Sequence, residues 1–203
     1  MIDARDTPLL PFTRADLGGR SLYRAVRVDL SVRPGHGRLW LDASGTGGFD
    51  LPWQRHLQRL AAVGQSAYDL PWQRTDLFVS SKAKSLVLDG ASASLPVFIA
   101  WTALLAGVAL PDPFLATGVA LDTSGVLAPA PRDYIQGKLA FADAYARQMH
   151  GHERRQPIWI PAGSEVSPDP WSALDVRPVE SLTEGVSRVL GLSPREGAER
   201  ARS

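Results

Sequence analysis

The 203-residue sequence contains no cysteine, carries almost no net charge, and has no excess of glycine or proline. The lack of cysteine excludes disulfides, thiolate nucleophiles and cysteine-ligated zinc, and it is compatible with a cytoplasmic protein. Because 22 basic residues balance 21 acidic ones, the chain has no long-range field that would attract nucleic acid or an anionic membrane. Its 18 glycines and 16 prolines fall short of the content of disordered or collagen-like chains, so we expect a folded core.

One stretch, residues 91–110, is long enough and free enough of charge to suggest a membrane span. It contains Ser92, Ser94, Pro96 and Thr102, and no basic cluster flanks it. We therefore expect a helix buried in the protein core, from about residue 96 to 106, and no membrane association. The charged N-terminal residues do not resemble a secretory signal.

Hydrophobic periodicity predicts short strands and about four helices in one α+β (mixed α/β) domain. Segments 22–32 and 38–42, joined by a Pro-Gly turn, are expected to form an opening antiparallel β-hairpin. Further strands are expected at 75–80, 85–88, 114–121, 157–160 and 174–177, and helices at 50–64, 96–106, 132–148 and 180–190. We divide the chain into an N-terminal segment, 1–19, a domain, 20–192, and a charged tail, 193–203, that we expect to be disordered.

The six-residue string Asp-Leu-Pro-Trp-Gln-Arg occurs twice, at 50–55 and 69–74. Two copies of so short a string do not make a repeat protein, because each repeat would have to be a whole supersecondary unit. We interpret the copies as two helix starts or turns, and a shared binding function is the alternative.

Several motifs of cofactor and metal sites are missing. The Gly137-Lys138 pair lacks both the upstream glycine and the following Ser or Thr of a phosphate-binding loop. The glycine-rich segment 44–48 does not match the dinucleotide-binding fingerprint. His150 and His152 lie in a polar segment that is typical of a solvated surface loop. We therefore predict no cofactor and no metal.

Ser92 lies at the junction between a predicted strand and the apolar helix. Two interpretations are open at this point. The hydroxyl can lie beside free N–H groups at the helix N-terminus, which can stabilise an oxyanion. Alternatively, Ser92 is only the N-cap of that helix.

Lys138 falls within an apolar stripe of the predicted helix 132–148. The stripe consists of Ile135, Leu139, Ala142 and Ala146. Burial disfavours the charged form of an amine and lowers its pKa, so Lys138 is a candidate base near neutral pH. The alternative is a lysine at the edge of the stripe whose amine reaches water.

A nucleophile elbow is a competing interpretation of Ser92. Ser92, Asp133 and His150 follow the Ser, Asp, His order of the α/β-hydrolases, but Ser94 replaces the last elbow glycine and the chain is short for that fold. Residues 81–84 match Ser-x-x-Lys without the companion motifs of that class, and we treat the match as chance.

Four fragments occur in a characteristic order along the chain. They are Asp89-Gly90-Ala91-Ser92-Ala93, Thr117-Gly118, Gly125-Val126-Leu127-Ala128-Pro129 and Lys138-Leu139-Ala140-Phe141-Ala142. This order resembles the proteolytic domain of the Lon proteases, and the similarity extends over residues 20–192. It implies the fold of that domain, with an opening hairpin and small sheets packed with about four helices.

The resemblance also implies a serine–lysine dyad. Ser92 matches the nucleophile, Lys138 the base, and Thr117 a threonine that orients the lysine. The implied activity is that of a serine endopeptidase on unfolded or exposed polypeptide segments, independent of ATP because this chain has no ATPase domain. The family further implies a homo-oligomer, commonly a six-membered ring, and allows a separate ATPase or regulatory partner.

The sequence departs from the family pattern around the dyad. Ala91 replaces a proline, Ser94 a glycine and Val119 a glutamate, and the glycine pair before the lysine is missing. Lys138 follows Ser92 by 46 residues, a few more than usual. An inactive Lon-like fold that serves as an assembly or binding module is therefore the alternative function.

Overall fold

The fold is that of a computed structural model, which describes residues 12–17, 20–25, 28–42, 48–49, 51–81, 87–88, 91–111, 114–150, 155–166 and 171–195. Predictions for the remaining residues, among them most of the glycine-rich segment 44–48, Asp89-Gly90, His152 and the tail from 196, lie outside the described residues.

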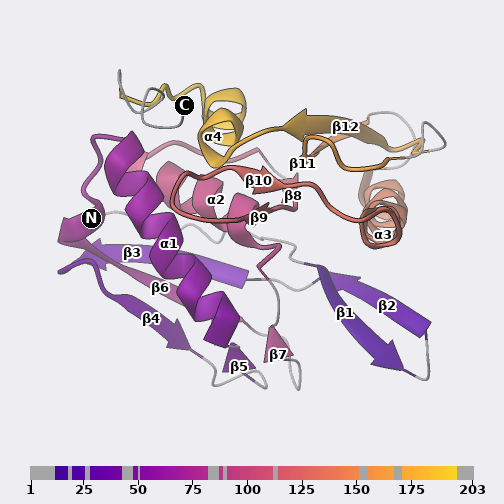
Figure 1. The fold of residues 1–203 in the computed structure, drawn as a ribbon, viewed down its shortest axis with the longest axis horizontal. Coiled ribbons are helices and arrows are strands. Elements are labelled where there is room, and N and C mark those ends of the chain that lie inside the picture. Colours follow the sequence, from indigo (N-terminus) through magenta and orange to yellow (C-terminus); the bar gives the residue numbers. More distant parts are fainter. Residues whose placement is uncertain are drawn as a thin grey trace.

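The described chain is a mixture of helices and short strands, which confirms the α+β fold class (Figure 1). The α-helices are α1 (Leu51–Ala67), α2 (Ser94–Ala106), α3 (Arg132–His150) and α4 (Leu182–Leu190), and a 3₁₀ turn, η1, spans Trp72–Arg74. The strands are β1 (Phe12–Leu17), β2 (Arg20–Ala25), β3 (Val28–Pro34), β4 (Leu39–Asp42), β5 (Gly48–Phe49), β6 (Thr75–Ser81), β7 (Val87–Leu88), β8 (Leu115–Ala116), β9 (Val119–Ala120), β10 (Leu127–Ala128), β11 (Gln156–Pro161) and β12 (Leu174–Val179).

The predicted hairpin between 22–32 and 38–42 is wrong. Strand β6 lies between β3 and β4, antiparallel to β3 and parallel to β4, so the two do not pair with each other. The antiparallel pair at the start of the described chain is instead β1 with β2. Alternating residues in β3 and β4 indicate which face is buried, and a strand from another part of the chain can pair with either.

Asp76, near the start of β6, binds the turn that connects β3 to β4. Its carboxylate accepts hydrogen bonds from the backbone N–H of His36 (2.8 Å) and Arg38 (2.9 Å) and from the indole of Trp40 (3.1 Å). The bond from the Arg38 amide, followed by the other two, holds the pKa of Asp76 below its ordinary value. The turn between β3 and β4 is thus fixed over the start of β6.

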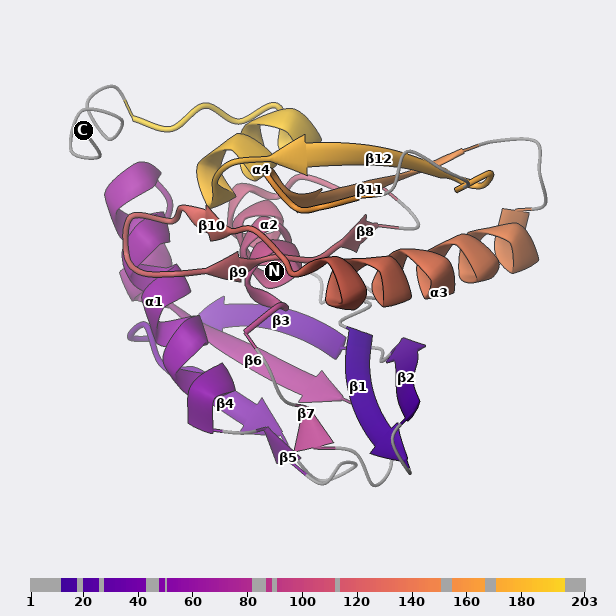
Figure 2. The same ribbon diagram turned by 45° about the vertical axis from the view of Figure 1, so that its right-hand side comes forward.

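A second three-stranded sheet, in the order β12, β11, β8, is parallel throughout. Helix α2 lies between this sheet and the β3–β6–β4 sheet (Figure 2) and contacts α1, α4, β3 and β8. Every residue of α2 except the last is buried. The predicted buried helix is therefore confirmed. Among the described residues, no helix combines the length and the apolar character needed to cross a bilayer.

The described residues form two hydrophobic cores in this arrangement. The first surrounds α2 and includes buried residues of α1, α4, β3 and β6. The second lies between α3 and the parallel sheet, and its members are Leu115, Ile135, Leu139, Ala142, Ala146, Ile158, Ile160, Ala173 and Leu174. The sheet alternates between them: Ile158 and Ile160 face the second core, whereas Trp159 belongs to the first.

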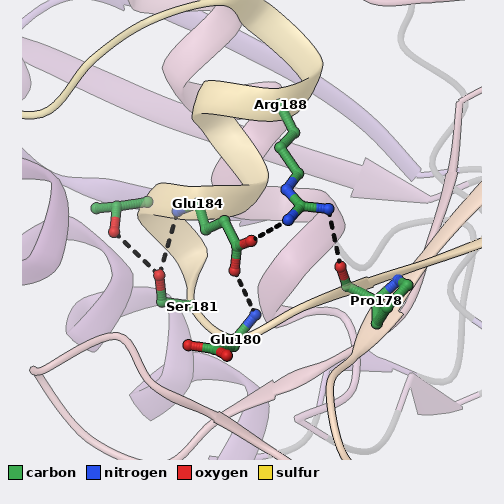
Figure 3. Close-up of polar contacts among 6 residues, drawn as sticks. Pro178, Glu180, Ser181, Glu184 and Arg188 are labelled. Atoms are coloured by element: carbon green, nitrogen blue, oxygen red, sulfur yellow. Dashed lines mark hydrogen bonds and ion pairs between the residues drawn. The ribbon is translucent and has the colours of Figure 1, made fainter.

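Helix α4 begins at a capping box (Figure 3). The Ser181 hydroxyl accepts a hydrogen bond from the N–H of Glu184 (3.2 Å), and the Glu184 carboxylate accepts one from the N–H of Glu180 (2.6 Å). Arg188 pairs with Glu184 at 2.7 Å and donates to the Pro178 carbonyl at 3.4 Å. These contacts fix the end of β12 to α4, which packs against α2.

The two copies of the six-residue string adopt different structures. The first copy enters α1, which begins at Leu51, whereas the second forms a turn and η1. In the second copy, Trp72 is buried and packs on Phe98 and Trp101. Gly64 of α1 lies so close to the Trp72 indole that an added Cβ would overlap the ring. The second copy therefore contributes to the core.

Candidate active site

Ser92 precedes α2 but does not cap it. The N-cap residue is Ala93, whose side chain makes no capping bond, so the interpretation of Ser92 as an N-cap is wrong. Only 6% of Ser92 is exposed. Its hydroxyl oxygen lies 2.9 Å from Lys138 Nζ, which donates a hydrogen bond to it.

Lys138 lies in the buried stripe of α3, as predicted from its spacing. Ile135, Leu139 and Ala142 are fully buried, and Lys138 between them is 0% exposed. The alternative of an amine that reaches water is therefore wrong. The amine is instead directed at two hydroxyl groups, those of Ser92 and Thr117.

Thr117 reaches Lys138 because it directly follows β8 and continues the alternation of that strand. Residues two apart on a strand share a face, and Leu115 faces the second core beside α3. The Thr117 hydroxyl accordingly accepts a hydrogen bond from Lys138 Nζ at 2.9 Å. The Thr117 N–H donates to the Trp159 carbonyl at 2.9 Å, which anchors this segment to β11.

A parallel bridge between Ala93 and Gly118 holds the backbone of Ser92 against the same segment. The Gly118 N–H donates to the Ser92 carbonyl (2.9 Å), and the Leu95 N–H donates to the Gly118 carbonyl (3.2 Å). The Thr117 hydroxyl also contacts the Ser92 carbonyl at 3.5 Å. The predicted continuous strand 114–121 is divided here into β8 and β9, and the division brings Thr117 and Gly118 against Ser92.

Tyr134 is a site residue that was not predicted from the sequence. Its hydroxyl donates a hydrogen bond to Ser92 Oγ at 3.1 Å, and its ring centroid lies 4.2 Å from Lys138 Nζ. Tyr134 precedes Lys138 by one helical turn on α3, which places the two side chains on one face. That spacing is visible in the sequence, but the contact with Ser92 depends on the tertiary fold.

The residues of the competing interpretation do not gather in the same way. Asp133 is exposed at the start of α3, and the side chain of His150 lies outside the description. The hydrogen bonds of the Ser92 hydroxyl run to Lys138 and Tyr134. In the described part of the chain, His, Cys, Asp and Glu side chains do not form a group of three or more that would hold a metal ion.

The three predicted site residues thus meet at one buried point. A hydroxyl at hydrogen-bonding distance from an amine can lose its proton to that amine when the amine is neutral. No family model matches this sequence, and no curated protein matches it.

Proposed function

We propose that the chain is a Lon-like serine endopeptidase in which Ser92 is the nucleophile and Lys138 the general base. The observation that carries the proposal is the 2.9 Å contact between Lys138 Nζ and Ser92 Oγ at a site where the lysine is fully buried. The hydrogen bond from Lys138 to Thr117 supports it, because a second hydroxyl fixes the direction of a flexible side chain.

The proposed reaction begins with transfer of the Ser92 proton to neutral Lys138. Removal from water disfavours the ammonium form, so burial is expected to lower the pKa of Lys138 toward neutrality. Ser92 Oγ then bonds to the peptide carbonyl carbon, and Lys138 returns the proton to the leaving amine. Water then hydrolyses the resulting ester in the same way: Lys138 takes a proton from the water and returns it to Ser92 Oγ, which restores Ser92. The reaction needs neither cofactor nor metal.

Backbone N–H groups next to Ser92 would stabilise the oxyanion of the tetrahedral intermediate. The N–H of Ser94 already donates to the Ala91 carbonyl at 2.9 Å, and that of Leu95 donates to Gly118. We therefore assign the role of oxyanion donor to the N–H groups of Ser92 and Ala93.

The broader assignment follows from the resemblance to the Lon proteolytic domain. The substrates are unfolded or exposed polypeptide segments, cleaved in the cytoplasm without ATP hydrolysis by this chain. The working form is a homo-oligomer, which in the Lon family is commonly a six-membered ring, and the family pattern also allows a separate ATPase or regulatory partner.

The test is degradation of casein without ATP by the wild-type chain and by Ser92→Ala and Lys138→Ala. Both substitutions are expected to abolish cleavage while circular dichroism stays unchanged. Ser66→Ala, which removes a serine hydroxyl at an exposed position of α1, is the matched control and is expected to cleave normally. Activity of the wild-type chain should rise with pH as Lys138 loses its proton, and a flat profile from mildly acidic to alkaline pH would contradict the dyad.

One observation favours the second candidate, an inactive assembly or binding module. Ser92 exposes only 6% of its surface, and a peptide carbonyl must reach its hydroxyl for cleavage. A serine-directed covalent inhibitor separates the two candidates. Labelling of Ser92 supports the peptidase, and a wild-type chain that is neither labelled nor active supports the module.

A further inference from the structure

Tyr134 makes two different contacts with the dyad. Its hydroxyl lies 3.1 Å from Ser92 Oγ, and its ring face lies 4.2 Å from Lys138 Nζ. Ser92 Oγ is therefore approached by two donors, one from each of two residues a helical turn apart on α3. The family pattern that assigns Ser92, Lys138 and Thr117 gives this tyrosine no role.

The two contacts match the two charges that the proposed first step creates. When the proton leaves Ser92, negative charge develops on Oγ, and a hydroxyl that donates to Oγ stabilises that charge. At the same moment Lys138 becomes an ammonium ion, and the face of an aromatic ring attracts a nearby cation. Both interactions are stronger after proton transfer than before it, which is the condition for an effect on rate.

We infer that Tyr134 is a further catalytic residue, which stabilises the nucleophilic oxygen through its hydroxyl and the protonated base through its ring. This inference rests on the proposed function. In the step concerned, the O–H bond of Ser92 breaks, an N–H bond forms on Lys138, and Oγ bonds to the carbonyl carbon. Tyr134 keeps its own proton throughout, so the step needs no further reactant.

Tyr134→Phe tests the role of the hydroxyl, because it removes that group and keeps the ring beside Lys138. Tyr145→Phe is the matched control, since it removes a tyrosine hydroxyl from the same helix three turns away. The readout is the rate at which a fluorophosphonate probe labels Ser92, followed by mass spectrometry of the intact protein. Labelling joins Oγ to phosphorus, releases fluoride and transfers the serine proton to Lys138.

Loss of a hydrogen bond to a developing charge is expected to slow labelling about 10- to 100-fold in Tyr134→Phe and to leave Tyr145→Phe at the wild-type rate. With a peptide substrate, removal of the Tyr134 hydroxyl should lower kcat by a similar factor and leave KM unchanged. Thermal unfolding of both variants verifies that they are folded.

The outcomes separate this inference from the proposed function. If the wild-type chain and Tyr134→Phe are labelled at equal rates, the inference about Tyr134 fails and the dyad stands. If Tyr145→Phe slows labelling as much as Tyr134→Phe, the effect belongs to the packing of α3, and the inference fails. If the wild-type chain is neither labelled nor active, the proposed function and this inference fail together.

Discussion

Thr117→Val tests the proposal that the Thr117 hydroxyl orients Lys138. Valine keeps the branched shape of threonine and replaces the hydroxyl, which accepts from Lys138 Nζ at 2.9 Å, by a methyl group. An N–H group that loses its acceptor in a buried site costs about 1–3 kcal/mol. For a chain of this length we expect Tm to fall by roughly 2–4 °C for each kcal/mol. Because Nζ is then held less firmly toward Ser92, kcat of the proposed peptidase should fall by about 10- to 100-fold with KM unchanged.

Thr117→Ser is the control variant for this prediction. It keeps the hydroxyl and removes a buried methyl group, at a cost of about 1 kcal/mol. The two variants should therefore lose similar stability, as measured by urea unfolding, while only the valine variant loses the proposed peptidase activity. Full activity in Thr117→Val, or an equal loss of activity in both variants, would refute the orienting role of the hydroxyl.

Three further predictions concern stability, each measured as the free energy of unfolding in urea. Gly64→Ala should destabilise the protein by about 1–2 kcal/mol, because overlap with the Trp72 ring outweighs the roughly 1 kcal/mol that alanine adds to a helix; a more stable variant would show that the ring moves freely. Folding lowers the pKa of Asp76, so its carboxylate stabilises the fold above an unfolded pKa of about 4 and loses this effect as pH falls through the folded pKa. The stability difference between wild type and Asp76→Asn should shrink in acid, and a constant difference from pH 7 to 2 would contradict the Asp76 contacts. Ser181→Ala should cost about 1 kcal/mol through loss of the α4 cap, and an unchanged stability would argue against that cap.

Local patterns predicted the helices well. The uncharged run at 91–110 contains α2, and the apolar stripe around Lys138 is the buried face of α3. In both cases the signal lies within one helix, where spacing alone determines which residues share a face. The same reasoning predicted the burial of Lys138, and its contact with Ser92 followed only from the resemblance to a known family.

Predictions that depended on a partner from elsewhere in the chain were less successful. The alternation in β3 and β4 predicted strands correctly, but it contains no information on β6, which separates them. Tyr134 was missed for a similar reason. Its spacing from Lys138 is a helix property, whereas its contact with Ser92 joins residues that are 42 positions apart.

The bridge between Ala93 and Gly118 joins the segment that precedes α2 to the segment that follows β8. The neighbour of Ser92, Ala93, belongs to the core around α2. The residues beside Lys138, Ile135 and Leu139, belong to the core between α3 and the parallel sheet. In the proposed enzyme, nucleophile and base therefore come together only once both cores have formed. A nascent chain in which only one core has formed would therefore lack a working dyad.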